Sequence, residues 1–437
     1  MLKINKTMLL RKITISNFKN FDFAEIDLGK INVIVGANAS GKSNLIQAIK
    51  FIKDIEEMGI DNAISLQGGI DFLTNIQLKE KKSCTISIEL VPQEGSIIDV
   101  VKPHSLIALS YRRIKYLIEI KKKNGKKFEI VREELTYDIK IEELVGSNDD
   151  NEVTDPFSLL DFTYNLKIDK GKLSKSTTLE KKKLTVQLSN DQEYKIKEAR
   201  LSPIIIDFDL IKRNVNKSES LLRQFNLLTP KSLDFLVYDF DVKNSKKPAN
   251  ITGKSSLEEN GENLAMVIKR ILEDKDDKRK FSNLIREVLP FINEISIEKL
   301  YDNSLLFKVK ENYNNSAIIP SSLLSDGTIA VTSIIAASFF EDKKLVIFEE
   351  PEKGIHPAII SKIMNLFYDA SKNKQILITT HNPEIVKHTK LEDLLLMRRS
   401  ANGFSTVIKP NEMESVHIFL KSDLGVDQLF IQNLLDI

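Results

Sequence analysis

The sequence has few of the features that mark secreted and membrane proteins. It contains one cysteine, Cys84, in 437 residues, which excludes an intramolecular disulfide and is typical of a reducing cytosol. The longest apolar run, 329–340, is interrupted by Thr332, Ser333 and Ser338 and is too short to span a bilayer. No cationic leader with a following apolar segment opens the chain. We therefore expect a cytoplasmic protein without a membrane partner.

An excess of one charge sign is also missing. Lysine and arginine number 64 against 62 aspartates and glutamates, a net charge of +2, so the total charge neither indicates nor excludes a polyanionic partner. No internal repeat and no sustained heptad pattern is visible, which argues against repeat and long coiled-coil architectures. The length is sufficient for two or three folded units.

A glycine-rich loop, Gly36 to Ser43, carries the strongest functional signal. Its sequence is Gly-Ala-Asn-Ala-Ser-Gly-Lys-Ser, and it lies between an apolar β-branched run, 31–35, and a segment with helical apolar spacing, 44–54. Strand, glycine loop and helix are the context in which this motif binds the phosphates of a nucleoside triphosphate. We expect Lys42 to reach the β- and γ-phosphates and the Ser43 hydroxyl to bind Mg2+. The predicted nucleotide-binding residues are Gly36, Ala37, Asn38, Ala39, Ser40, Gly41, Lys42, Ser43 and Asn44.

Two adjacent carboxylates follow a second apolar strand. Residues 345–348 predict a buried parallel strand, and Glu349 and Glu350 come directly after it. We expect Glu349 to hold Mg2+ through its water shell. Glu350 is placed to accept a proton from the water that attacks the γ-phosphorus.

A histidine ends the next predicted strand. Residues 375–379 precede Thr380 and His381, and an imidazole there can donate a hydrogen bond to the γ-phosphate. His356 is expected on a loop that faces a neighbouring subunit. The other histidines, His104, His388 and His417, have no such context.

A second anion-binding helix start is predicted at Ser325 to Thr328. Ser325 has the character of a helix N-cap, Gly327 permits close backbone approach, and an apolar helix follows. Two phosphate sites in one chain are explained if two chains pair head to tail. Each chain would then offer this turn to the ATP that the other chain holds.

The pattern of the chain changes twice along its length. Three strands are expected before the phosphate loop, at 9–16, 23–27 and 31–35. From about Ser83 to Arg200 period-two alternation predicts a β-rich insertion with a hairpin, 116–120 and 128–131, around Asn124-Gly125. A second strand pair, 162–168 with 184–188, is expected after an acidic linker, 148–155.

The segment from Ile211 to Asn293 favours helices. An exposed loop is expected at 242–260 and a helix with a clear apolar face at 262–273. A strand at 304–309 is expected to return the chain to the sheet. The apolar tail, 414–437, is expected to cap the core of its own domain.

Two lysine clusters, 121–127 and 181–183, lie in the β-rich insertion. They could grip a nucleic-acid phosphate backbone. Lysine is abundant throughout the chain, however, and exposed edge strands use it to prevent aggregation. We favour a solvated surface for both clusters.

Together these segments resemble a known family. Residues 15–21, 36–44, 324–328, 348–357 and 379–384 look like the motifs of the ATP-binding-cassette (ABC) type of ATPase head. The resemblance is to the non-transporter branch that includes RecF, SMC, Rad50 and OLD-type proteins, and most closely to the compact AAA-21-like ATPases. It implies an α/β fold: a P-loop NTPase head of the ABC type with an inserted β-rich and helical region.

The resemblance assigns a role to each motif. Walker A is Gly36 to Ser43, Walker B ends at Glu349, the catalytic glutamate is Glu350 and the switch histidine is His381. The signature motif that acts in trans is formed by Ser325, Asp326, Gly327 and Thr328. Lys19, Asn20 and Phe21 would lie near the adenine, and Gln67 corresponds to the Q-loop residue that touches Mg2+.

The resemblance also implies a division of the chain. Residues 1–80 form the N-terminal lobe of the ATPase head, 81–205 a β-rich insertion, 206–300 a helical insertion and 301–437 the C-terminal lobe. Glu349 stands where many relatives have aspartate, and the signature reads Ser-Asp-Gly-Thr instead of Ser-Gly-Gly-Gln. The 56 residues after His381 are too few for the fused Toprim nuclease that some relatives carry.

The sequence therefore predicts an ATPase with ATP and Mg2+ as cofactors and a second copy of the chain as partner. The family suggests DNA repair or defence against phage and plasmids, with a separate effector or nuclease, and nucleic acid as a further partner. An alternative is a nucleotide-gated scaffold or sensor that binds ATP with little turnover and assembles an effector. A P-loop kinase is a third alternative, which would leave Ser325 to Thr328 and His381 unexplained.

Overall fold

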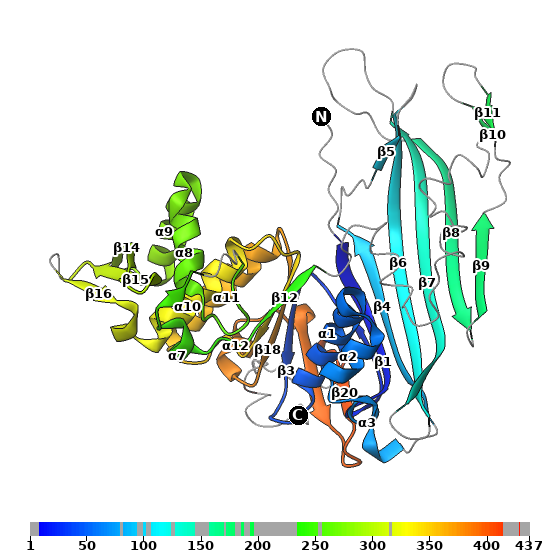
Figure 1. Cartoon of the computed structure of the whole chain (residues 1–437), viewed down its shortest axis with the longest axis horizontal. Coiled ribbons are helices and arrows are strands. Elements are labelled where there is room, and N and C mark those ends of the chain that lie inside the picture. Colours follow the sequence, from blue (N-terminus) through cyan, green and yellow to red (C-terminus); the bar gives the residue numbers. More distant parts are fainter. Residues whose placement is uncertain are drawn as a thin grey trace. The chain divides into compact units, whose positions relative to one another are not determined.

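The chain forms two compact units, which are described separately (Figure 1). The first unit comprises Met1–Asp27 and Asn44–Leu233, and the second comprises Leu28–Ser43 and Asp234–Ile437. The computed structural model describes residues 8–78, 82–93, 99–101, 106–123, 127–144, 157–169, 172–179, 185–187, 193–195, 234–251, 256–313, 317–413 and 428. The domain division predicted from the sequence remains a prediction.

The first unit is built on an eight-stranded antiparallel sheet. Its strands in spatial order are β2 (Phe21–Asp27), β1 (Met8–Phe18), β4 (Cys84–Pro92), β6 (Leu106–Lys122), β7 (Phe128–Leu144), β8 (Phe157–Asp169) and β9 (Lys172–Leu179), with β5 (Asp99–Val101) paired to β6. Alternate residues point to opposite faces of a strand, so Ile13 and Ile15 of β1 and Ile86 and Ile88 of β4 are all buried.

The described part of the first unit also contains the helices α1 (Lys42–Met58), α2 (Ile60–Leu66) and α3 (Ile70–Leu73) and the 3-10 turn η1 (Ile76–Leu78). From Asn44 onward α1 belongs to this unit, and it carries the apolar stripe that the sequence predicts: Leu45, Ile46, Ile49 and Ile52 are all buried. Phe51 of α1 lies against Phe18 of β1, with ring centroids 6.3 Å apart. Burial of this stripe, more than intrinsic propensity, stabilises the helix.

The predicted strands before the phosphate loop are confirmed as β1, β2 and β3 (Ile31–Val35). The predicted hairpin is confirmed as part of β6 and β7, which pair from Lys122 with Phe128 onward. Its Asn124-Gly125 turn lies outside the described residues, as do the acidic linker, Lys181 to Lys183 and the tail, apart from residue 428.

One predicted strand pairing is wrong. Residues 162–168 do belong to β8, but β8 pairs with β9, and β10 (Thr185–Gln187) pairs with β11 (Glu193–Lys195). Strands that follow each other closely in sequence tend to pair, and only residues 170 and 171 separate β8 from β9.

The second unit contains a six-stranded, mostly parallel sheet (Figure 1). Its order is β12 (Phe235–Tyr238), β17 (Leu345–Glu349), β18 (Gln375–Thr380), β3, β19 (Leu394–Arg399) and β20 (Ser405–Ile408), and only β20 runs antiparallel to its neighbour. All residues of β3 and β18 are buried, which is expected of parallel strands that are covered on both faces. The predicted strands at 345–348 and 375–379 are thereby confirmed.

The helices of the second unit are α7 (Val242–Ser245), α8 (Leu264–Glu273), α9 (Lys275–Val288), α10 (Asp326–Phe339), α11 (Pro357–Ser371) and α12 (Pro383–Lys387). Of these, α11 packs against β18 and β3 of this sheet, whereas α8 and α9 contact the strand at 292–299. Phe348 of β17 lies at the centre of the core. Its ring centroid is 5.6 Å from that of Tyr238 and 4.9 Å from that of Phe367. The predicted helix at 329–340 is confirmed as α10, and its buried surroundings explain its apolar sequence.

A separate antiparallel sheet holds β13 (Ala249–Asn250), β15 (Ser304–Glu311), β14 (Ile292–Lys299) and β16 (Ile318–Pro320). The strand predicted at 304–309 is confirmed as β15, but its return to the main sheet is wrong, because β15 pairs with β13, β14 and β16. The second unit also contains three single turns of 3-10 helix: η2 (Ser321–Leu323), η3 (Leu391–Asp393) and η4 (Pro410–Glu412).

The mostly helical prediction for 211–293 is partly wrong. The helix predicted at 262–273 is confirmed as α8, whereas β12 was missed and the predicted loop at 242–260 contains α7 and β13. β12 has four residues and finds its partner, β17, far along the chain, so no local period reveals it. Among the described residues no helix is both long and apolar enough to cross a membrane.

Candidate active site

The phosphate loop connects the end of β3 at Val35 to the start of α1 at Lys42. It is packed tightly at its base. A Cβ atom on Gly36 would lie 2.2 Å from the Met397 carbonyl oxygen, so only glycine fits there. The Gly36 N–H donates to the Thr380 carbonyl at 3.3 Å, and the Ser405 hydroxyl donates to the Ser40 carbonyl. The loop is therefore anchored to β18 and β20.

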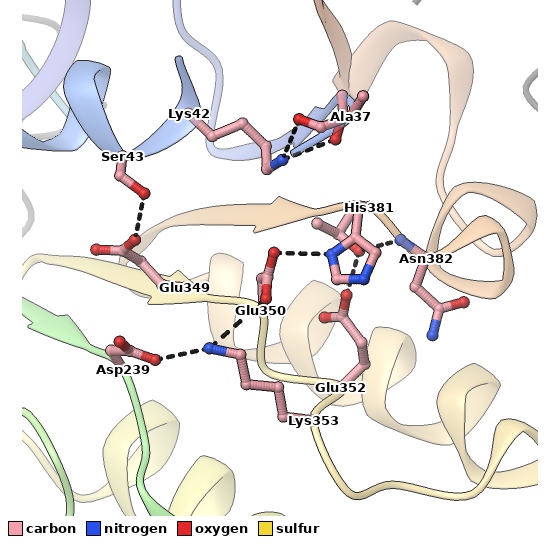
Figure 2. Close-up of polar contacts among 12 residues, drawn as sticks. Ala37, Lys42, Ser43, Asp239, Glu349, Glu350, Glu352, Lys353, His381 and Asn382 are labelled. Carbon is pink, nitrogen blue, oxygen red and sulfur yellow. Dashed lines mark hydrogen bonds and ion pairs between the residues drawn. The ribbon is translucent and has the colours of Figure 1, made fainter. Parts of the chain in front are cut away.

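Lys42 turns back over its own loop (Figure 2). Its side chain is buried, and its Nζ donates to the carbonyl oxygens of Gly36 at 2.7 Å and Ala37 at 3.0 Å. Burial lowers the pKa of Lys42, while the carboxylates of Glu349, Glu350 and Glu352 act in the opposite direction. The ammonium group is thus held at the loop by two neutral acceptors, which an anion can replace.

Ser43 and Glu349 are brought together from distant parts of the chain. The Ser43 hydroxyl donates to Oε2 of Glu349 at 3.0 Å. A hydroxyl and a carboxylate oxygen at this separation suit Mg2+, which takes oxygen ligands and is usually bound by one or two protein groups together with substrate phosphates. Among the described residues no group of three or more His, Cys, Asp or Glu side chains could hold a metal. The Ser43 hydroxyl and the Glu349 carboxylate together fit a magnesium ion that is shared with a nucleotide.

Glu350 stands at the end of β17 in a strained backbone conformation. Its φ is 46°, in the left-handed region that residues with a Cβ rarely adopt. The Glu350 N–H donates to the Thr379 carbonyl at 2.9 Å, and the Glu350 carbonyl accepts from the Lys353 N–H at 3.1 Å. These two hydrogen bonds hold the carboxylate-bearing residue beside the end of β18.

His381 meets Glu350 at this edge of the sheet. Nδ1 of His381 lies 2.7 Å from Oε1 of Glu350 (Figure 2). An ionised carboxylate can only accept, so Nδ1 carries the proton in this contact. The structure thus places the predicted base and the predicted histidine in direct contact.

Glu352 is a buried acid beside them. The Thr380 hydroxyl donates to its Oε1, and its Oε2 has no hydrogen-bond partner among the residues that the structure describes. Burial raises the pKa of Glu352, and the nearby charge of Glu350 adds to that rise. The Asn382 N–H donates to the same Thr380 hydroxyl at 2.9 Å, which ties the start of α12 to this buried pair.

Two residues at the site were not found from the sequence. Lys353 lies with its Nζ 3.6 Å from Oε2 of Glu350, and it donates to Oδ1 of Asp239 at 3.0 Å. Lys353 could have been noticed as a cation three residues after Glu350. Asp239 directly follows β12, the strand that the sequence did not reveal.

The signature turn begins α10. The Ser325 hydroxyl accepts from the Thr328 N–H at 3.2 Å, which confirms the predicted N-cap. A Cβ on Gly327 would lie 3.2 Å from the Gly354 carbonyl oxygen, which confirms close backbone approach at this glycine. Asp326 pairs with Nζ of Lys246 at 2.5 Å. The contact of this turn with a second chain remains a prediction.

Five predicted site residues lie in the first unit: Lys19, Asn20, Phe21, Asn44 and Gln67. Lys19 Nζ donates to the Gln47 amide oxygen, and Gln67 is the C-cap of α2. Their contacts with nucleotide or metal remain predictions. His356 is the N-cap of α11, where its Nδ1 accepts from the Ala358 N–H at 3.2 Å.

Comparison with known proteins identifies relatives. RecF of Geobacillus kaustophilus, a DNA replication and repair protein, is 29% identical over 86 residues, 19% of this chain and 23% of RecF. Endonuclease GajA of Bacillus cereus is 40% identical over 58 residues, 13% of this chain and 10% of GajA. The chain therefore spans less than a quarter of the length of these curated relatives.

The solved structures that match the chain include SMC heads. The SMC head domain from Thermotoga maritima has a TM-score of 0.38 and 14% identity, covering 92% of this chain and 98% of that one. The Smc head derived from Pyrococcus furiosus, bound to the C-terminal domain of ScpA, has a TM-score of 0.42 and 11% identity, covering 95% and 100%.

The family model described as "AAA domain, putative AbiEii toxin, Type IV TA system" matches residues 31–95 and 186–387, more than half of the chain. The match includes the phosphate loop, the signature turn, the two carboxylates after β17 and His381. With a phosphate loop between β3 and α1 in a mostly parallel sheet, the fold is that of a P-loop NTPase. The chain belongs to the AAA_21 family, and short stretches of it are similar to RecF and to GajA.

Proposed function

We propose that the chain hydrolyses ATP to ADP and phosphate in composite sites that two copies form head to tail. The observation that carries the proposal is the grouping of four side chains at the end of the parallel sheet. Ser43 lies 3.0 Å from Glu349, and His381 lies 2.7 Å from Glu350. The first pair suits the metal of a nucleotide, and the second suits the deprotonation of water.

Each residue of the site has a task in this reaction. Lys42 exchanges the carbonyls of Gly36 and Ala37 for the β- and γ-phosphate oxygens. Glu350 accepts a proton from water as the new oxygen–phosphorus bond forms and the bond to the ADP oxygen breaks. His381 donates to Glu350 through Nδ1, and its ring, when protonated at both nitrogens, donates to the γ-phosphate through Nε2. Mg2+, held by Ser43 and Glu349, would neutralise phosphate charge.

The second copy of the chain supplies the other half of the site. The Ser325 turn at the start of α10 offers a hydroxyl and the positive end of a helix dipole, which together favour phosphate. A site split between two chains makes pairing depend on ATP, and hydrolysis would release the pair. Nucleotide state would thereby be converted into assembly state.

We further propose that this cycle acts on a partner protein or on nucleic acid, in DNA repair or in defence against phage and plasmids. The names of the relatives support this: one is a replication and repair protein, one is an endonuclease, and the family description includes a toxin–antitoxin system. A separately encoded effector or nuclease is the expected partner. Capture of partners by the Glu350→Gln protein with ATP, followed by their identification, would test this.

The Glu350→Gln variant tests hydrolysis. It keeps the shape of the side chain but cannot accept the proton, so turnover should fall by at least about 100-fold. ATP affinity should be retained, and ATP-bound dimers should accumulate in light scattering. Glu273→Gln, at an exposed ion pair on α8, is the matched control and should leave turnover unchanged.

Wild-type turnover by the Glu350→Gln variant would contradict the proposed base. If the wild type instead turned over ATP slowly and no added nucleic acid or partner accelerated it, that result would favour a nucleotide-gated scaffold. Transfer of phosphate to an acceptor other than water would favour a kinase.

A further inference from the structure

We propose that Lys353 is a positioning residue that sets the orientation of the Glu350 carboxylate, and that Asp239 holds Lys353 for this purpose. The assignment rests on the proposed function of Glu350 as the base that activates water. It adds two residues to the hydrolytic site, and one of them follows a strand at the edge of the sheet.

Both oxygens of the Glu350 carboxylate have a partner. Oε1 faces Nδ1 of His381 at 2.7 Å, and Oε2 faces Nζ of Lys353 at 3.6 Å (Figure 2). With a single partner, the carboxylate could still turn about its last carbon–carbon bond. A second partner on the other oxygen limits that rotation and keeps one oxygen directed toward the place of the attacking water.

Lys353 is itself held in place. Its Nζ donates to Oδ1 of Asp239 at 3.0 Å, and Asp239 directly follows β12, which pairs with β17 through the whole of its length. The Asp239 N–H donates to the Glu259 carbonyl at 3.0 Å. A long, flexible lysine side chain is thus fixed at both its backbone and its ammonium end.

The backbone of Lys353 contributes as well. Its N–H donates to the Glu350 carbonyl at 3.1 Å, next to the residue whose φ is 46°. A strained conformation persists where several contacts specify it together. Lys353 therefore restrains Glu350 twice, through the peptide group and through the side chain.

The local charges keep this contact ionic. Partial burial acts to lower the pKa of Lys353, but the hydrogen bond and charge of Asp239, together with Glu350, outweigh it and raise the pKa. The ammonium group therefore stays charged. Oε1 of Glu352, a further acid near Glu350, accepts from the Thr380 hydroxyl.

The first test is the Lys353→Met variant. It retains the length and much of the volume of the side chain but loses the cation. We expect kcat to fall about tenfold, since a base that is free to rotate spends less time in the reactive geometry. KM for ATP and the dissociation constant for a non-hydrolysed ATP analogue should stay at wild-type values. Lys353→Arg should restore most of kcat.

Two further variants separate positioning from structural damage. Asp239→Asn should lower kcat by a smaller factor, and it should have no further effect in the Lys353→Met background, because both act through one contact. Lys372→Met, at an exposed ion pair with Asp369, is the matched control and should leave kcat unchanged. The melting temperature of every variant is recorded alongside.

The outcomes distinguish this assignment from the proposed function. If Glu350→Gln is inactive while Lys353→Met and Asp239→Asn have wild-type kcat, the positioning role is wrong and the function stands. If Lys353→Met raises KM and leaves kcat unchanged, Lys353 binds substrate instead. If Glu350→Gln turns over ATP at the wild-type rate, the function and this assignment fail together.

Discussion

Replacing Lys374 with methionine should change how the stability of the second unit depends on pH. Lys374 lies between α11 and β18 with 8% of its surface exposed, and its Nζ donates to the Glu341 carbonyl at 2.7 Å. It lines a cavity of about 420 Å3, together with Lys280 and Lys344. Burial lowers the pKa of Lys374 from 10.5 to about 8; the charges of Glu341 and Asp342 oppose that change, and those of Lys344 and Lys280 add to it.

The sign and size of the effect follow from this pKa. Below pH 8 the lysine is protonated in both the folded and the unfolded state, and the folded state carries the cost of a buried charge. Between pH 8 and 10.5 the folded state loses the proton while the unfolded state keeps it, so the free energy of unfolding rises with pH. The full rise is about 3 kcal/mol, of which about 2 kcal/mol should be complete by about pH 9.5.

Urea unfolding at a series of pH values measures this rise. The quantity to compare is the free energy of unfolding of the wild type minus that of Lys374→Met, because other titrating groups cancel in the difference. Loss of the hydrogen bond to Glu341 shifts the difference by a constant and leaves its slope unchanged. If the wild type and Lys374→Met have parallel pH profiles from pH 8 upward, the reasoning about the buried ammonium is wrong.

Two further predictions concern the phosphate loop and the metal. Gly36→Ala should destabilise the second unit by about 1–3 kcal/mol and abolish ATP binding, because the new Cβ would meet the Met397 carbonyl. The control is Gly29→Ala, whose Cβ would be 3.5 Å from its nearest neighbour and which should melt like the wild type. Equal melting temperatures of the wild type and both variants would contradict the packing argument. Glu349→Gln should raise the Mg2+ concentration for half-maximal turnover by more than about tenfold, and an unchanged magnesium titration would remove Glu349 from the metal site.

The parts of the site that could be predicted each had a local signal. The phosphate loop lies between a strand and a helix that the periodicity of 31–35 and 44–54 reveals, and β3 and α1 confirm both. Glu349, Glu350 and His381 follow short apolar runs of the kind that is typical of buried parallel strands. Neighbouring parallel strands end at the same edge of a sheet, so the meeting of Glu350 and His381 follows from chain direction alone.

The parts that could not be predicted depend on contacts between distant residues. β12 has four residues and no periodicity that distinguishes it from a helix, and it is specified by its pairing with β17. Asp239 therefore could not be placed beside Lys353 before β12 was known. The same limit explains the error at β8: alternation located the strand, but the partner of a strand is decided by the whole sheet.

The two-chain site is the central claim, and mixing two inactive variants tests it most directly. Glu350→Gln lacks the base and keeps its signature turn, while Ser325→Arg keeps the base and blocks the turn. The two proteins are mixed one to one without nucleotide, and ATP is then added. Half of the dimers should contain one chain of each kind, and each of these dimers has one intact site of two. The account predicts turnover of about a quarter of the wild-type rate from two proteins that are inactive alone. A mixture as inactive as its components would contradict it.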